Sequence, residues 1–152
     1  MKITEYPNRI PEIYGTFIAA GLTLYFLLSY WTGFVHVIEL RLLNLVILAM
    51  GVYLSLKQYQ RTHHGQVNYF RAFVIGVASS TIGTSTFVLF LFILFNLDKP
   101  LFESVVKDEP MGRFLNIYVS TFAVWYEGIF SGIFTTFVLV NTIDTSESSE
   151  AP

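Results

Sequence analysis

One carboxylate interrupts a long apolar run in the last third of the chain. It is Glu127, within the stretch AVWYEGIF at residues 123–130. If this run crosses a membrane, a charged carboxylate that faces lipid costs at least about 2.5–3.5 kcal/mol. Acids inside membranes can relay protons or cations, or can pair with basic groups of another helix. The surroundings of Glu127 therefore decide what chemistry the protein can perform.

Small and polar residues surround Glu127 at helical spacing. Ser120, Ala123, Ser131 and Thr135 follow one another and Glu127 at intervals of three or four residues. A helix would place them along one stripe, which we expect to face the inside of a helical bundle. The predicted intramembrane polar seam contains one acid, four serines and one asparagine: Glu127, Ser131, Ser120, Ser79, Ser80 and Asn44.

Four glycines accompany these polar residues. Gly128 and Gly132 lie beside Glu127, and Gly76 and Gly83 lie in an earlier apolar segment. Intervals of four and seven residues keep each pair on one helix face. Because small residues let membrane helices approach closely, we predict that these glycines pack against other helices.

Three interpretations of Glu127 are open. First, it is a protonated or hydrogen-bonded packing residue. Second, it relays protons or cations, with Ser79, Ser80 and Ser131 lining the path. Third, it pairs with a charged residue of another subunit, because we expect no basic side chain of this chain at its depth. Arg41 could reach towards it, but such side chains ordinarily extend to the membrane surface.

Other reactive arrangements are absent from the sequence. With no cysteine, the chain has no disulfide, thiolate zinc site, iron–sulfur cluster or c-type haem attachment. We interpret His36, His63 and His64 as residues outside the apolar segments and not as metal ligands. No phosphate-binding loop or catalytic triad pattern occurs, and a net charge of -2 does not favour nucleic acid. We expect no enzyme activity, cofactor or metal.

The elements that position these residues are predicted to be membrane-spanning helices. Hydrophobic residues make up 53% of the 152-residue chain and charged residues 13%, which is about half the charged share of a soluble domain. About 20 apolar helical residues cross a bilayer, and the alternating period of barrel strands does not appear. The sequence predicts an all-α membrane protein with four transmembrane helices in two antiparallel hairpins, over residues 13–34, 37–56, 69–97 and 114–140.

The segments between and after the spans also carry predictions. Residues 57–68 are polar and basic, whereas residues 98–113 contain four apolar residues on one helical face, which indicates a short interfacial helix. A single domain is expected over residues 1–140, and the acidic, Ser-rich residues 141–152 are expected to be a disordered tail.

Basic residues cluster around the second connection. Lys57, Arg61 and Arg71 are expected to contact lipid headgroups. Cytoplasmic segments of membrane proteins carry an excess of Lys and Arg. The cluster therefore favours a topology with both termini in the cytoplasm.

The run GVYLSLKQYQRTHHGQVNYFRAFVIG, residues 51–76, resembles the central signature of a bacterial family of small four-helix membrane proteins, catalogued as domain of unknown function 4199. The matching residues on the two sides of the polar loop are Gly51, Tyr53, Leu54, Lys57, Tyr59 and Arg61, then Tyr69, Arg71, Ala72, Phe73 and Gly76. The loop THHGQVN departs from the more Gly- and acid-rich turn of that family, and the last apolar segment shows no match. The resemblance implies a four-helix protein of the bacterial inner membrane and implies no activity.

These patterns together predict a non-catalytic integral membrane protein. It would be an accessory or interaction subunit of a membrane complex, or a homo-oligomer. Its partners would be membrane lipids and either another membrane protein or a second copy of the chain. The alternative is a small proton- or cation-coupled transporter or channel in which Glu127 titrates.

Overall fold

Helices account for all of the regular structure in the described part of the chain. The computed structural model describes residues 9–33, 38–63, 67–107 and 112–143. In chain order the elements are α1 (Ile10–Trp31), α2 (Ile38–Thr62), α3 (Tyr69–Leu97), α4 (Lys99–Val106), the 3-10 helix η3 (Gly112–Phe114) and α5 (Ile117–Val140). These residues contain no strand, which confirms the predicted all-α class.

Four of these helices are long and apolar enough to cross a membrane, namely α1, the part of α2 from Leu42 onwards, α3 and α5. Large apolar side chains are exposed on each of them, such as Phe17 on α1, Leu42 on α2, Leu89 on α3 and Phe134 on α5. An apolar surface of this extent is unfavourable in water and favourable in lipid. The chain is therefore a multi-pass integral membrane protein.

Local sequence signals fix several helix ends. Asn68, Asp98 and Asn116 are the N-caps of α3, α4 and α5, and the Oδ1 atom of each accepts a hydrogen bond from a backbone N–H three residues later, at 3.1, 3.0 and 2.8 Å. Pro11 and Pro100 lie in the first turns of α1 and α4, where a missing N–H is tolerated. The cap at Asn116 explains why the last span begins later than residue 114.

The second helix is longer than predicted. The apolar pattern predicts a span that ends at residue 56 and a connection over residues 57–68, whereas α2 continues to Thr62. Lys, Gln and Arg have high helix propensity, and Tyr59 within the extension is only 2% exposed. These polar residues therefore extend the helix beyond its apolar part.

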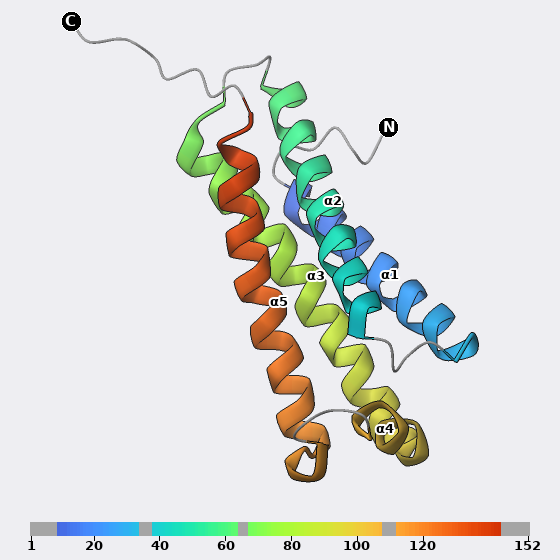
Figure 1. Cartoon of the computed structure of the whole chain (residues 1–152). Helices are drawn as coiled ribbons and strands as arrows, with labels where there is room; N and C mark the ends of the chain where they lie inside the picture. The colour runs from blue at the N-terminus through green and yellow to red at the C-terminus, as the bar shows by residue number, and fades with distance from the viewer. Residues whose placement is uncertain (1–8, 34–37, 64–66, 108–111, 144–152) are drawn as a thin grey trace, which may run out of the picture.

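Helix α3 occupies the centre of the bundle and packs against α1, α2 and α5 (Figure 1). The pairs α1/α2 and α3/α5 run antiparallel, as the predicted hairpins require. The beginnings of α1 and α3 lie at the same end of the bundle as the final turns of α2 and α5, and we call this the terminal end (Figure 1). Helix α4 lies at the opposite end, which we call the α4 end (Figure 1).

Aromatic side chains join the helices near the α4 end. The ring centroid of Phe26 on α1 lies 6.4 Å from that of Phe87 and 6.2 Å from that of Phe95 on α3. Phe95 in turn contacts Phe102 of α4 at 5.4 Å, and Leu101 beside it is 3% exposed. The predicted short helix is thus α4, which is anchored by its apolar face under the end of α3.

Candidate functional site

Helices α3 and α5 pack through three close contacts at four-residue spacing. In each contact, a glycine on one helix receives a hydroxyl-bearing side chain of the other. The pairs are Gly76 with Thr136, Ser80 with Gly132, and Thr84 with Gly128. A Cβ atom added to Gly132 would lie 2.6 Å from the Ser80 Cβ, well inside the 3.4–4 Å of an ordinary contact. We call these three pairs the glycine–hydroxyl ladder.

Two of the three ladder hydroxyls, those of Ser80 and Thr136, donate hydrogen bonds to backbone carbonyl oxygens of their own helix. Ser80 donates to the carbonyl oxygen of Val77 at 2.9 Å, and Thr136 donates to that of Gly132 at 2.7 Å. The Cγ2 of Thr136 therefore fills the space above Gly76, whereas Ser80 places both its Oγ and its Cβ over Gly132. The three glycines and Ser80 are among the residues predicted from the sequence, whereas Thr84 and Thr136 are not. The regular spacing of small residues on both helices was the signal that could have found them.

The fourth predicted packing glycine, Gly83, contacts α1 instead of α5. Ile18 of α1 is 1% exposed and lies between Gly83 of α3 and Gly51 of α2. A Cβ atom on Gly83 would lie 2.7 Å from the Ile18 Cβ and 3.0 Å from the carbonyl oxygen of Gly15. This contact joins three helices at one apolar side chain.

The predicted seam serines of α3 face different neighbours. Ser79 and Ser80 are both 0% exposed. Ser80 packs on α5, whereas Ser79 lies beside α1, where its carbonyl oxygen is 3.0 Å from the position that a Gly15 Cβ would take. The Ser79 hydroxyl donates to the carbonyl oxygen of Ile75 at 2.8 Å. The two serines therefore do not line one common path.

Three buried polar atoms have no hydrogen-bond partner among the described residues. They are Oδ1 of Asn44, Oγ1 of Thr84 and Oγ of Ser120. Asn44 and Ser120 belong to the predicted seam and are half-buried, as is Ser131. Thr84 is 2% exposed and meets Gly128, the residue after Glu127. Unsatisfied polar atoms therefore occur on α2, α3 and α5.

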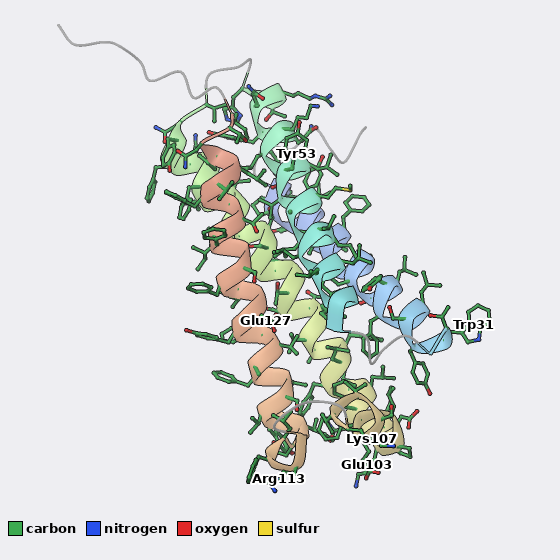
Figure 2. All side chains as sticks on the ribbon, viewed as in Figure 1. Trp31, Tyr53, Glu103, Lys107, Arg113 and Glu127 are labelled. Atoms are coloured by element: carbon green, nitrogen blue, oxygen red, sulfur yellow. The ribbon has the colours of Figure 1, made fainter. Side chains whose placement is uncertain are left out.

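Glu127 does not face the interior of the bundle, which corrects the prediction from the sequence. Its side chain is exposed, on the middle part of α5 (Figure 2). Within the residues that the structure describes, its carboxylate makes no hydrogen bond or ion pair; the side chain of Arg41 lies outside them.

Helix geometry explains this difference. Residues four apart on a helix are displaced by about 40° around its axis, because each turn contains 3.6 residues. Along the predicted stripe, Thr135 is 8% exposed, Ser131 is half-buried, and Glu127 and Ala123 are exposed. The stripe therefore begins in the core near the terminal end and winds onto the outer surface of α5 by Glu127.

Glu127 lies deep in the span. It is ten residues after Ile117 and thirteen before Val140, or about 15 and 20 Å from the two helix ends at 1.5 Å per residue. Its neighbour Gly128 contacts Thr84, which is near the middle of α3. The carboxylate is thus exposed at a depth where lipid chains would surround an isolated copy.

The predicted headgroup-contact residues lie at the terminal end. Lys57, Arg61 and Arg71 are all exposed, and the Lys57 Nζ lies 5.5 Å from the ring centroid of Tyr53. The α4 end carries both signs of charge, with Glu103, Lys107 and Arg113 among its exposed residues (Figure 2).

The described residues contain no group of three His, Asp or Glu side chains that could hold a metal ion. The ring of His63 packs on Tyr59 with a centroid distance of 4.3 Å. His36 and His64 lie outside the described residues, as do residues 144–152 of the predicted tail.

No protein-family model, curated protein or solved structure matches this chain. The class of protein is therefore inferred from the structure of the chain itself. Four apolar helices form one bundle, the ladder fixes α3 against α5, and Glu127 is exposed at mid-span. The protein is a multi-pass helical membrane protein with an acid on the outer surface of its bundle at mid-span.

Proposed function

We propose that the protein is a non-catalytic interaction subunit, which binds another membrane protein or a second copy of itself through the face of α5 around Glu127. The observation that carries this proposal is the exposed Glu127 carboxylate at mid-span, which pairs with none of the described side chains. Lipid leaves such a group without hydrogen bonds, at a cost of at least about 2.5–3.5 kcal/mol if it is charged. A basic or hydrogen-bonding group of a partner helix would remove that cost.

The surface around Glu127 is suited to a helix of another subunit. Ala123 is exposed one turn before Glu127, and half-buried Ser131 follows one turn after it, so a second backbone can approach closely along this line. Tyr126 and Phe130 beside it are 63% and 65% exposed. Exposed aromatic residues are enriched at protein interfaces.

The same geometry gives less support to the alternative of an ion path. A relay through Glu127, Ser79 and Ser80 would need these groups to line one polar route. Glu127 is on the outer surface, Ser80 packs on Gly132, and Ser79 lies beside α1. An interface role requires no such route.

The proposal also includes the location and the family. The exposed basic residues at the terminal end support a cytoplasmic position for that end, in a bacterial inner membrane. The four-helix architecture is the one that the resemblance of residues 51–76 to the four-helix family implies.

Extraction from native membranes in a mild detergent, followed by native mass spectrometry, tests the proposal. We expect the wild-type protein to carry a stoichiometric partner or to form a defined homo-oligomer. The Glu127→Leu variant should lose this partner or no longer form the homo-oligomer. Glu127→Gln should retain it if the contact is a hydrogen bond and lose it if the contact is an ion pair.

Leu24→Ala provides a matched control, because Leu24 is 61% exposed on α1, away from α5. This variant should retain the partner. A wild-type protein that is monomeric under these conditions would contradict the proposal. A partner that stays bound to Glu127→Leu would remove Glu127 from the interface.

A further inference from the structure

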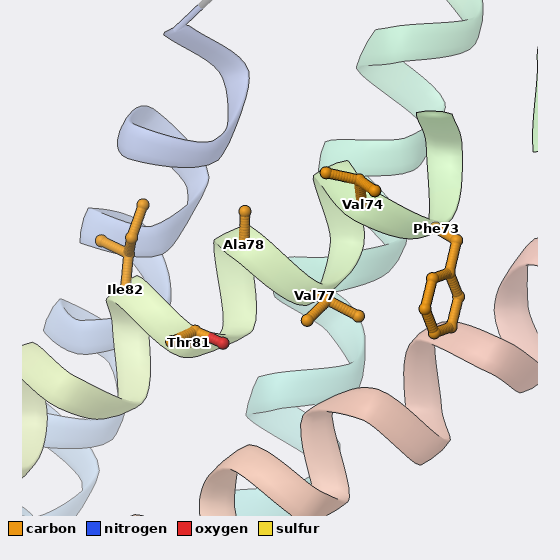
Figure 3. Close-up of a pocket in the computed structure, with 6 residues that line it drawn as sticks. All are labelled: Phe73, Val74, Val77, Ala78, Thr81 and Ile82. Carbon is orange, nitrogen blue, oxygen red and sulfur yellow. The ribbon is translucent and has the colours of Figure 1, made fainter. Parts of the chain in front are cut away.

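The outer surface of α3 has a shallow apolar depression of about 380 Å³ (Figure 3). Its lining residues all belong to α3: Phe73, Val74, Val77, Ala78, Thr81 and Ile82. The depression exists because Ala78 is small and lies one turn from the larger Val74 and one turn from the larger Ile82, so the helix surface is lower between them (Figure 3).

A basic side chain lies on the same face of α3, next to the depression. Arg71 is exposed, three residues before Val74 and seven before Ala78, so all three share one helix face. Its backbone N–H is bonded to Asn68 Oδ1, but its guanidinium makes no hydrogen bond or ion pair with the rest of the described chain. With respect to the described residues, the guanidinium can bind an anion at the membrane surface.

The length of this face matches one leaflet of a bilayer. From Arg71 to Ile82 there are eleven residues, or about 16 Å at 1.5 Å per residue, and the hydrocarbon core of a bilayer is about 30 Å thick. One turn beyond Thr81, the Nε1 of Trp125 on α5 donates a hydrogen bond to the Ser85 hydroxyl at 3.0 Å. This bond crosses from α5 to α3 just past the inner end of the depression. An acyl chain extends through one leaflet and fits a surface of this length, whereas a membrane-spanning helix would need a surface that extends through both leaflets.

The charge at the terminal end fits an anionic headgroup. Arg9, Lys57, Arg61 and Arg71 are exposed there, with Glu12 as the exposed acid of the first turn of α1. Basic residues near a membrane surface attract anionic lipids, and each contributes about 1 kcal/mol. We infer that the outer face of α3 binds one anionic phospholipid, with its phosphate on Arg71 and an acyl chain along the depression at Ala78.

Tryptophan fluorescence provides a direct test, because Trp125 lies at the inner end of the depression. The Trp31→Phe variant leaves Trp125 as the sole tryptophan. This variant is reconstituted into phosphatidylcholine vesicles that contain chain-brominated phosphatidylglycerol or chain-brominated phosphatidylcholine at equal mole fractions. We expect the anionic lipid to quench Trp125 with about fivefold higher apparent affinity, the ratio that corresponds to about 1 kcal/mol for one basic residue.

Two variants separate the headgroup from the chain. Arg71→Gln should reduce the preference to about one, whereas Ala78→Phe should fill the depression and reduce quenching by both lipids. Lys107→Gln removes an exposed basic residue at the opposite, α4 end, and Ala20→Phe enlarges an exposed alanine on α1. Both controls should retain the fivefold preference. Equal quenching by the two lipids, or an unchanged preference in Arg71→Gln, would overturn the inference.

A second measurement identifies the occupant. The chain has no cysteine, so Ala78→Cys gives a unique thiol for a short photo-crosslinker. In native membranes, an adduct with the mass of one phospholipid supports the site. A crosslink to a polypeptide would show that a protein covers this face and would overturn the inference.

Discussion

Exchanging the glycine and the serine of one pair of the glycine–hydroxyl ladder tests whether steric complementarity between these two side chains stabilises the contact of α3 with α5. In Gly132→Ser, the new Cβ would lie 2.6 Å from the Cβ of Ser80, so the two helices must separate locally. Overpacking of this kind costs about 1–3 kcal/mol, and the higher helix propensity of Ser compared with Gly offsets about 0.5 kcal/mol. We expect the free energy of unfolding to fall by about 0.5–2.5 kcal/mol.

The double variant Ser80→Gly/Gly132→Ser should recover much of this loss. It moves the glycine to α3 and the hydroxyl to α5, which is the arrangement of the neighbouring pair Gly76 and Thr136. Residues in contact commonly show coupling free energies of about 0.5–3 kcal/mol. We expect the double variant to be at least about 1 kcal/mol more stable than the sum of the two single changes.

The assay is equilibrium unfolding in mixed micelles by a denaturing detergent, with Trp125 fluorescence as the signal in a Trp31→Phe background. Trp125 is hydrogen-bonded across to α3, so its emission reports directly on the α3–α5 contact. Ala123→Ser introduces the same side chain at an exposed position of α5 and should change stability by no more than about 0.5 kcal/mol. If the loss of unfolding free energy in the double variant equals the sum of the losses in the two single variants, steric complementarity between residues 80 and 132 does not stabilise the contact.

Three further predictions concern other contacts. Ile18→Ala should lower the free energy of unfolding by about 2–5 kcal/mol, because Ile18 fills the space between Gly51 and Gly83; a loss below 1 kcal/mol in the same assay would contradict that role. Trp125→Phe should cost about 0.6 kcal/mol, the average for a hydrogen bond between membrane helices, measured by circular dichroism during the same titration, and an unchanged midpoint would show that the bond to Ser85 adds nothing. Asp98→Ala should destabilise α4 by about 0.5–2 kcal/mol through loss of its N-cap bond, which should appear as faster amide exchange in residues 101–106 with no change in α5.

The helices could be predicted from the sequence because their main cause is local. A run of apolar residues long enough to cross a bilayer must be helical, since lipid offers no partner for backbone groups. The extension of α2 to Thr62 differs from the prediction because polar residues do not by themselves end a helix, and Lys57 and Arg61 are good helix formers. At a membrane surface, composition marks the end of the apolar span and not the end of the helix.

The direction of Glu127 could not be predicted in the same way. A four-residue stripe turns gradually around a helix, so whether a given member faces inward depends on where the neighbouring helices lie at that depth. The glycines were easier to interpret, because Gly76, Gly128 and Gly132 each have a partner at the same four-residue spacing. The depression at Ala78 depends on an outer face of α3 that no other helix covers, and a single sequence does not report this.

The central place of α3 has a consequence for how the protein is assembled during synthesis. Chains are made from the N-terminus, so α1 and α2 enter the membrane before α3 exists. At that stage Ile18 has Gly51 on one side, while the other wall of its site, Gly83, is still missing. The packing of the first hairpin around Ile18 is therefore incomplete until α3 is inserted, and the contacts of the ladder form only after α5 has followed α3.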